Sequence, residues 1–184
     1  AFNPKGDQLL ISGYHEITVW NLAGDLVQRI GDQGERTYSI DLHPTLPLVL
    51  SASGTPGVSG EVRLFDLSTG GLNSVLVTAN EVIMDARYSP DGKTIAVALP
   101  NGTTQLISAE TGGMTGKLLG HSDQVTSVAW HSDGKRLATA SRDHTAKVFD
   151  CQSGASVATF TGHTRSVNDV VFVGNDQAIS VSTD

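Results

Sequence analysis

The sequence predicts an all-β fold, a β-propeller built from four-stranded blades, and a repeat of about 42 residues carries this prediction. The pair Gly120-His121 recurs 42 residues later as Gly162-His163. The tetrad Ser-Pro-Asp-Gly at 89–92 recurs, in altered form, as His-Ser-Asp-Gly at 131–134. A third marker, an apolar residue followed by a small polar one, ends four short apolar runs. These four pairs are Trp20-Asn21, Phe65-Asp66, Ile107-Ser108 and Phe149-Asp150.

The repeat at 121–162 shows its four strands most clearly, because turn residues separate the apolar runs. From the innermost outward, we expect strands at Gln124–Trp130, Arg136–Ser141, Thr145–Asp150 and Ser156–Phe160. Turns typical of a meander lie between them, at Asp133-Gly134, Asp143-His144 and Ser153-Gly154. Apolar residues adjoin each other in the central strands, as at Val148-Phe149. This pattern indicates sheets that are covered on both faces.

Two further repeats follow the same pattern, so three blades are complete. One has strands at Thr37–Leu42, Leu48–Ser53, Glu61–Asp66 and Ser74–Thr78. The next has strands at Val82–Tyr88, Thr94–Leu99, Thr103–Ile107 and Gly116–Leu119. Parts of two more blades flank them, with strands at Gln8–Ser12, Glu16–Trp20, Leu26–Ile30, Ser166–Phe172 and Ala178–Ser182. The predicted blades divide the chain into 1–34, 35–79, 80–120, 121–162 and 163–184.

Three complete blades and parts of two are fewer than most rings contain. Propellers close with about four to eight blades, and seven would need roughly 7 × 42 residues. We therefore expect a partial propeller, a fragment whose partners include the missing blades of the same polypeptide. The alternative is a small four-bladed ring in which Ser166–Phe172 completes the first blade. That ring would leave Ala178–Ser182 as an exposed spare strand, which is an aggregation liability.

One connection departs from the repeat. Between the second and third strands of the first complete blade, residues 53–60 read Ser-Gly-Thr-Pro-Gly-Val-Ser-Gly and replace the tight turn at 142–144. We expect a Gly/Pro-rich excursion there. The segment lacks the Gly-x-x-x-x-Gly-Lys pattern and opens no predicted helix, so we do not interpret it as a phosphate cradle.

An aromatic residue followed by a small polar one, with Gly-His before it and Asp-Gly between, resembles the WD-repeat family. The resemblance covers all 184 residues and is sharpest between Gly120 and Asp150. The motifs that follow the family's order there are Gly120-His121, Ser132-Asp133-Gly134, Ser141-Arg142-Asp143 and Phe149-Asp150. The resemblance implies a β-propeller that binds proteins through its loops, and it places residues 53–60 on the usual partner-binding face. The Ser-Pro-Asp-Gly style resembles bacterial WD-repeat chains.

Composition excludes several classes of function. With 39% hydrophobic and 17% charged residues, the chain has the composition of a globular protein. The formal net charge is −7 and no long Lys/Arg cluster occurs, so we expect no nucleic-acid partner. No run approaches the roughly 20 apolar residues of a membrane span, so we expect no direct membrane insertion. The start of the chain lacks the features of a signal peptide, and localisation stays open between cytoplasm and bacterial periplasm.

The single cysteine, Cys151, cannot form an internal disulfide. The sequence contains neither a Cys-x-x-Cys-His haem attachment motif nor zinc-ligand spacing. We therefore expect no cofactor in this segment.

His121 is the residue that most resembles a catalytic base or a ligand. By the resemblance, it reaches Asp143 in the tight turn, and Ser141 or Thr145 completes a hydrogen-bond network that pins the turn. The same residue types recur in the next repeat as His163, Ser182 and Asp184. A Ser, a His and an Asp also fit a nucleophilic triad. Because a catalytic site is not usually copied once per blade, we interpret both sets as structural.

These networks depart from the family pattern. Phe149 stands where the family has an indole donor, so the last hydrogen bond cannot form in that blade. Trp20 keeps the indole, but Tyr14 occupies the aspartate position of its turn. The middle blade has Asn101 and Ile107 at the two positions.

Two other groups of residues are excluded as ligand sites. The histidines His121, His131, His144 and His163 do not predict a metal centre, because aligned positions lie a whole blade apart. In addition, His131 is expected in a turn on the face opposite His144. Four aromatic residues share one strand-end position and are interpreted as core between blades: Phe2, Tyr88, Trp130 and Phe172.

Loop residues remain as the candidates for function, since aromatic and Arg side chains on a rigid rim anchor protein interfaces. We expect six of them to gather on one partner-binding rim: Tyr14, His15, Asp123, Arg142, His144 and Arg165. The sequence thus predicts a scaffold for protein interaction with no catalysis in this segment. The alternative is the propeller portion of a larger bacterial periplasmic protein, either hydrolytic or redox and fused to a c-type cytochrome domain.

Overall fold

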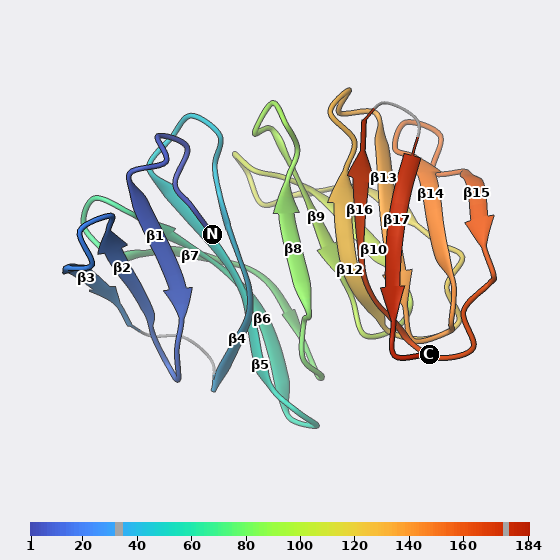
Figure 1. Cartoon of the computed structure of the whole chain (residues 1–184), viewed down its shortest axis with the longest axis horizontal. Coiled ribbons are helices and arrows are strands. Elements are labelled where there is room, and N and C mark those ends of the chain that lie inside the picture. The colour runs from blue at the N-terminus through green and yellow to red at the C-terminus, as the bar shows by residue number, and fades with distance from the viewer. Residues whose placement is uncertain (32–34, 175–176) are drawn as a thin grey trace. The chain divides into compact units, whose positions relative to one another are not determined.

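The computed structural model describes residues 1–31, 35–174 and 177–184, and it consists there of antiparallel β-sheets (Figure 1). Within each sheet, neighbouring strands are also neighbours in the sequence, as in a meander. The chain divides into two compact units, an N-terminal unit of Ala1–Ala86 and a C-terminal unit of Arg87–Asp184. The prediction of an all-β fold with four-stranded sheets is confirmed. The predicted blade boundary at residue 34 lies outside the described residues.

The N-terminal unit holds two sheets. The three-stranded sheet consists of β1 (Gln8–Ser12), β2 (Ile17–Asn21) and β3 (Leu26–Ile30). The four-stranded sheet consists of β4 (Arg36–Leu42), β5 (Leu48–Thr55), β6 (Ser59–Asp66) and β7 (Leu72–Ala79). Residues 1–3 run beside β1, where the Leu10 amide donates to the Ala1 carbonyl at 2.7 Å. In the repeat pattern, the innermost strand of a blade lies at this edge.

The C-terminal unit holds three sheets, and the boundary between the units falls within β8. The first sheet consists of β8 (Asp85–Tyr88), β9 (Thr94–Ala98), β10 (Thr104–Ser108) and β11 (Met114–Leu118). The second consists of β12 (Val125–Trp130), β13 (Arg136–Ser141), β14 (Ala146–Asp150) and β15 (Ser156–Phe160). The third has two strands, β16 (Val167–Val173) and β17 (Gln177–Ser182).

The register of the strands is irregular at the same place in successive sheets. In the pairing of the third strand with the outermost one, a shift occurs just before the marker residue, at Val19/Trp20, Leu64/Phe65, Leu106/Ile107 and Val148/Phe149. Three innermost strands also share a shift, at Thr37/Ser39, Val125/Ser127 and Val167/Asp169. A β-bulge increases local twist and re-aims side chains. The 42-residue marker therefore reports a repeated backbone geometry.

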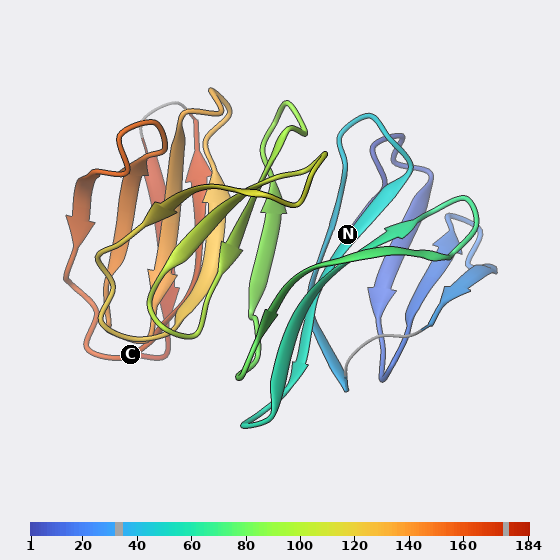
Figure 2. The ribbon, with the colours of Figure 1, turned by 180° about the vertical axis from the view of Figure 1, so that it is seen from behind.

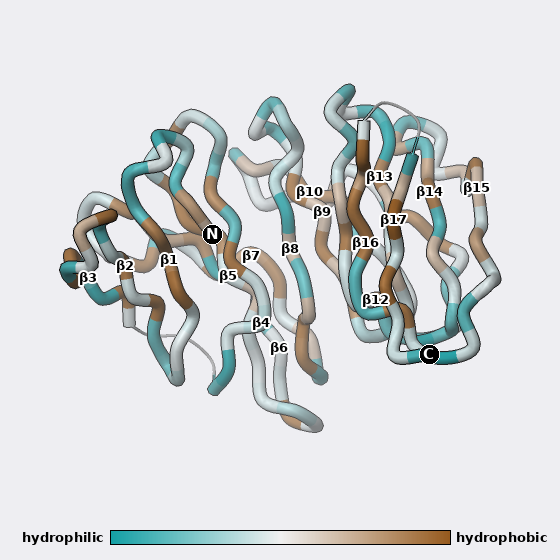
Figure 3. Tube along the Cα trace, in the orientation of Figure 1, coloured by the Kyte–Doolittle hydropathy of each residue, from teal (hydrophilic) through white to brown (hydrophobic). Residues whose placement is uncertain are grey.

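The core of each unit lies between its sheets, where the strands carry long apolar stretches (Figure 3). The marker residues Phe65, in the N-terminal unit, and Phe149, in the C-terminal unit, are the largest fully buried side chains among the described residues. In the N-terminal unit, the core cluster contains Leu10, Ile17, Val19, Ile30, Ile40, Leu42, Val49 and Phe65. In the C-terminal unit, Phe149 packs with residues of β9 to β13, and Val148 packs with β16. Burying one such side chain contributes about 1.5–3 kcal/mol to folding.

The same kind of side-chain hydrogen bond, from a serine to an aspartate of the next repeat, occurs within each unit. In the N-terminal unit, the Ser39 hydroxyl donates to the Asp85 carboxylate at 2.6 Å. In the C-terminal unit, the Ser127 hydroxyl donates to Asp169 at 2.6 Å. These bonds satisfy polar groups where the strands pack closely.

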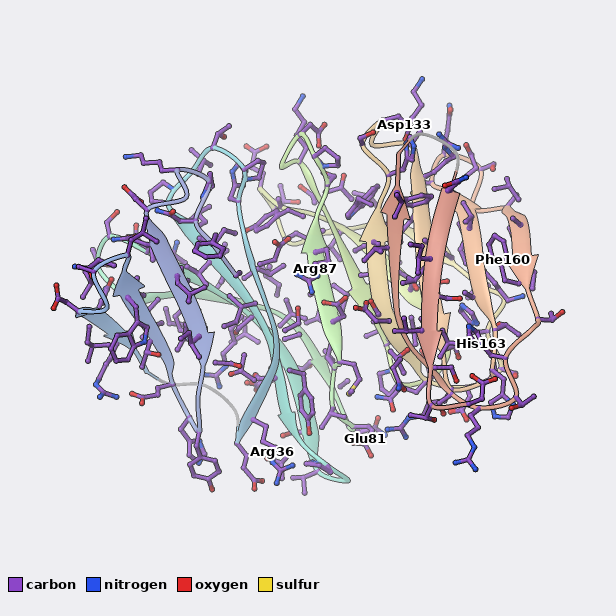
Figure 4. The ribbon with its side chains drawn as sticks, in the orientation of Figure 1. Arg36, Glu81, Arg87, Asp133, Phe160 and His163 are labelled. Atoms are coloured by element: carbon purple, nitrogen blue, oxygen red, sulfur yellow. The ribbon has the colours of Figure 1, made fainter. Side chains whose placement is uncertain are left out.

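The four strand-end aromatic residues do not share one environment. Tyr88 is buried, and Trp130 and Phe172 pack against the core clusters of the C-terminal unit. The Trp130 indole donates to the carbonyl of Arg87, which Figure 4 labels on β8, at 3.1 Å. Phe2 is 59% exposed, so the prediction of a core position is wrong for this residue. Phe2 pairs with Leu9 on the sheet edge and does not belong to the core cluster of this unit.

Residues 53–60 form a longer hairpin rather than an irregular excursion. β5 and β6 pair through this segment to Thr55 and Ser59, and the hairpin projects beyond the end of β4 (Figure 2). A side chain on Gly60 would overlap the Glu81 carbonyl and lie 2.8 Å from the Ile83 amide nitrogen. The two strands therefore continue because glycine lets residues 81–83 pack directly on the hairpin. The same packing leaves Val82 outside β8, which begins at Asp85 instead.

Candidate functional site

The loop before β12 and the turn after β13 meet around the ring of His121. Nδ1 of His121 lies 2.8 Å from Asp143 Oδ2, and Nε2 lies 2.7 Å from the Thr139 hydroxyl. The His121 and Asp143 side chains are 1% and 7% exposed, and Thr139 is 0% exposed. Because an ionised carboxylate only accepts, Nδ1 carries the proton and donates to Asp143. Nε2 then accepts from the Thr139 hydroxyl.

The protonation states follow from burial and from these partners. Burial lowers the pKa of His121, and the hydrogen bond and charge of Asp143 only partly oppose this effect. Burial acts to raise the pKa of Asp143, but hydrogen bonds from Thr145, His121 and the Ser122 amide lower it to about 2. Near neutral pH, the pair is therefore a neutral imidazole that donates to an ionised carboxylate.

Asp143 joins two loops that are distant in the sequence. Its Oδ2 accepts from the Ser122 amide at 3.0 Å, in the loop before β12. Its Oδ1 accepts from the Thr145 amide at 2.9 Å and the Thr145 hydroxyl at 2.7 Å, within its own turn. One carboxylate thus holds the loop and the turn in a fixed arrangement.

Ser141, which we expected in this network, lies beside it. Its hydroxyl donates to the Asp123 carbonyl at 3.0 Å and accepts from the Asp143 amide at 3.1 Å. The Thr145 hydroxyl, the other one that we expected, lies 3.2 Å from Nδ1 of His121. The hydroxyl that reaches Nε2 belongs to Thr139, which our sequence reasoning missed. Strand alternation was the available signal, because residues two apart on β13 share a face.

The arrangement recurs at the end of the C-terminal unit. Nδ1 of His163, labelled in Figure 4, lies 3.0 Å from Asp184 Oδ1, and Nε2 lies 2.9 Å from the Ser180 hydroxyl. The Thr164 amide donates to Asp184 at 2.7 Å, as the Ser122 amide does to Asp143. Ser182, which we expected here, accepts from the Asp184 amide at 3.4 Å and does not reach the ring. Ser180 is therefore the second hydroxyl that the sequence reasoning missed.

No indole extends the His121 network. The ring of Phe149 packs edge-on against His121, with ring centroids 6.4 Å apart. In the N-terminal unit, the Trp20 indole donates to the Thr18 hydroxyl at 2.9 Å. A phenyl ring has no donor, so the Thr139 hydroxyl oxygen receives nothing from Phe149.

Thr139, His121 and Asp143 have the connectivity of a hydroxyl–imidazole–carboxylate triad. A nucleophile must meet a substrate, however, and the Thr139 side chain is fully buried inside the sheet. A buried, fully satisfied chain of hydrogen bonds rigidifies a fold. The geometry of Thr139, His121 and Asp143 therefore suits a role in stabilising the loop and turn better than a role in a reaction.

The six expected rim residues lie at strand ends in both units. In the N-terminal unit, Tyr14 is 68% exposed, packs edge-on against the ring of His15 at 4.1 Å, and pairs through its backbone with Arg36. In the C-terminal unit, the Arg142 amide donates to the Gln124 carbonyl at 3.0 Å, next to Asp123. Arg142, Asp123, His144 and Arg165 are all exposed.

Two rim residues have left-handed backbone conformations. His15 and His144 are the non-glycine residues with positive φ among those described, at 61° and 70°. The corresponding turns of the other two blades have glycine in this conformation, Gly57 at 72° and Gly102 at 78°. An L-residue with a side chain is strained there.

Glu81 is a loop residue that the sequence reasoning did not single out. Its two carboxylate oxygens each lie 3.1 Å from the Gly57 amide nitrogen, and one also accepts from the Val82 amide at 2.8 Å. Figure 4 labels Glu81 in the segment that packs on the β5–β6 hairpin. Charge-assisted bonds of this kind are among the strong ones, so Glu81 fixes the tip of the hairpin.

The described residues contain no group of three or more His, Cys, Asp or Glu side chains that could hold a metal ion. Burial, with a smaller effect from Asp150, raises the pKa of the Cys151 thiol to about 12. A thiol in this state is a poor nucleophile and a poor metal ligand. Across the part of the chain that the structure describes, no helix has the length and apolarity needed to cross a bilayer.

His131 and His144 lie at opposite ends of the β13–β14 hairpin. His131 begins the turn that leads into β13, and its Nδ1 accepts from the amide of Asp133 at 3.1 Å. Figure 4 shows Asp133 and His163 at opposite ends of the strands of the C-terminal unit. His131 and His144 therefore lie too far apart along the hairpin to bind one metal ion together.

The model of the WD domain, G-beta repeat family matches residues 112–150 and 154–184. The first matched segment contains the loop, strands and turn that surround His121 and Asp143, and the second contains the recurrence at His163 and Asp184. No protein of curated function matches the chain. The two matched segments, both in the C-terminal unit, are similar to WD repeats.

Proposed function

We propose that this chain is a noncatalytic binding module that presents its rim loops to other proteins, as part of a larger WD-repeat propeller. The proposed blades are 35–79, 80–120 and 121–162, flanked by blade parts at 1–34 and 163–184. The remaining blades of the same polypeptide are its other partners. WD domains commonly bind proteins, and the repeat order together with the burial of Thr139 favours a scaffold over an enzyme.

The observation that carries this proposal is the strain retained at His15 and His144. A side chain in the left-handed region costs about 1–2 kcal/mol, and glycine avoids this cost at Gly57 and Gly102. Strain of this kind tends to persist at functional positions. Both histidines are exposed and belong to the expected rim. Contact with a partner explains why histidine, and not glycine, occupies these two positions.

The hydrogen-bond networks support the same function by fixing the loops. Asp143 ties its own turn to the loop that contains Asp123, and Ser141 bonds to the carbonyl of the same residue. Arg142 and His144 flank Asp143 in the sequence, so their backbones are held before any partner binds. Binding to a preordered surface avoids part of the entropic cost of association.

Site-specific photo-crosslinking in the source cells tests the proposal. A benzophenone side chain replaces Arg142 in the full-length parent, and a matched one replaces Ser132, an exposed residue in the turn at the other end of β13. We expect a discrete protein adduct from position 142 and none of that mass from position 132. A third variant carries the benzophenone in place of His144. Equal adducts from positions 142 and 132, or no adduct from either 142 or 144, would contradict a binding role for the rim.

A further inference from the structure

A groove of about 820 Å³ opens in the N-terminal unit, at the ends of the strands opposite Tyr14 and His15. Its walls come from the turn before β1, from β3, and from residues 44–47 and 67–68. Binding sites for small ligands and for single side chains of a peptide have volumes of this order. The groove therefore lies away from the proposed rim residues of this unit.

The walls of the groove are held by local hydrogen bonds. Asn3 Oδ1 accepts from the amides of Asp7 and Gln8 at 3.0 and 3.1 Å, which closes the turn before β1. His43 Nδ1 accepts from the amides of Thr45 and Leu46 at 3.2 and 3.0 Å. The rings of three lining prolines, Pro4, Pro44 and Pro47, further restrict the backbone. The groove is therefore preformed.

The lining combines apolar walls with one unpaired cation. Val27 and Leu46 line the groove and are each 51% exposed, so both side chains are accessible to a ligand. Lys5 also lines it and forms no ion pair or side-chain hydrogen bond with the described residues. Asp7 is the carboxylate of the lining, and it accepts from the Asn3 amide group at 2.7 Å. An apolar group with a carboxylate beside it complements this combination.

The C-terminal unit has a groove at the corresponding place, which serves as an internal comparison. It measures about 400 Å³, and Trp130, Lys135 and Asp150 line it. Thr115, the second residue of β11, lines this smaller groove. The equivalent residue of the larger groove is Val27, the second residue of β3. This groove is half the size and more polar, so we expect it to bind the same ligand more weakly.

We propose that the groove at Lys5, Val27 and Leu46 binds an extended segment of a partner protein in which an apolar side chain stands next to a carboxylate. The apolar side chain occupies the walls, and the carboxylate pairs with the Lys5 ammonium. The proposal rests on the function of the chain as a binding module but uses a surface separate from the rim.

Chemical-shift mapping on the isotopically labelled chain tests this proposal with defined probes. The probes are the blocked dipeptides acetyl-Leu-Glu-amide and acetyl-Leu-Gln-amide, with decanoate as a non-peptide carboxylate. We expect the Leu-Glu probe to shift the amides of Val27, Leu46 and Leu67, and to bind about two- to five-fold more tightly than the Leu-Gln probe, as for an exposed ion pair. We expect Lys5→Gln to abolish this preference, Leu46→Ser to weaken both dipeptides, and Lys135→Gln to change neither.

Three results would overturn the proposal: no shifts in this groove, equal affinity for the two dipeptides, or tighter binding of decanoate than of Leu-Glu. The last result would identify a lipid-like ligand instead of a peptide segment. The crosslinking experiment at Arg142 reports on the rim alone. A failure at the groove with intact crosslinking therefore rejects this inference and leaves the proposed function standing.

Discussion

At the scale of single residues, the hydroxyl of Thr139 is the part of the His121 network most open to a clean test. Thr139→Val keeps the shape of the side chain but leaves the buried Nε2 of His121 without a donor. An unsatisfied buried acceptor costs about 1–3 kcal/mol. We expect the free energy of unfolding in urea to fall by that amount, against less than about 0.5 kcal/mol for Thr159→Val on the exposed strand β15. Equal losses from the two variants would show that the hydrogen bond to His121 does not stabilise the fold.

The lowered pKa of His121 predicts how this stabilisation depends on pH. A histidine whose pKa is lower in the folded than in the unfolded chain binds fewer protons when folded, so its contribution falls as pH drops below about 6.5. Asp143, with a pKa of about 2, contributes stability above about pH 4 that is lost as pH falls toward 2.

The measurement compares the unfolding free energy of the wild type with that of His121→Gln, which cannot titrate. We expect the advantage of the wild type to shrink between pH 7 and pH 5.5. An advantage that grows over this range would mean that folding raises the pKa of His121.

His144 separates binding from stability. His144→Gly relieves the left-handed strain of about 1–2 kcal/mol but adds freedom to the unfolded chain, so we expect stability to rise by up to about 1 kcal/mol. The same variant removes the proposed contact, so we expect a weaker adduct from the benzophenone at position 142. Thermal unfolding and crosslinking yield measure the two effects. A destabilised variant would show that the histidine ring serves the fold.

At the scale of elements, the β5–β6 hairpin depends on the absence of side chains at its glycines. Gly60→Ala places a methyl group against the backbone of Glu81 and Ile83, and overpacking of this kind costs about 1–3 kcal/mol. Gly116→Ala on β11 is the matched control, because its methyl group meets only the Leu106 side chain at 3.5 Å. We expect a change within about 0.5 kcal/mol for the control. Indistinguishable unfolding curves for the two variants would contradict the close packing of residues 81–83.

The elements also show what could and could not be predicted from the sequence. The repeat and its turn residues predicted every observed strand to within a few residues, because period and punctuation are local signals. The length of the β5–β6 hairpin escaped this reasoning, since Gly54 and Gly60 look like loop formers until residues 81–83 pack on them. The roles of Thr139 and Ser180 escaped it too, because the partner of an imidazole depends on which face of a strand meets the loop.

At the scale of the whole molecule, the chain is a series of similar sheets in two compact units. In repeat proteins, stability is approximately a sum of terms within repeats and between neighbours. A change in one network should therefore act locally and spare sheets that lie far away in the sequence. The two histidine networks described here both lie in the C-terminal unit, within residues 121–184.

We propose that His121 and Asp143 hold the loops in place for binding and carry out no reaction, and hydrogen exchange of His121→Ala is the decisive test. Ser122→Ala is the control, because it keeps the amide that bonds to Asp143 and changes only an exposed side chain. We expect faster exchange at residues 122–124 and in β12 and β13 of His121→Ala, with β4 to β7 unchanged and the control like the wild type. Wild-type protection throughout His121→Ala, together with the loss of an activity of the parent protein, would contradict this proposal.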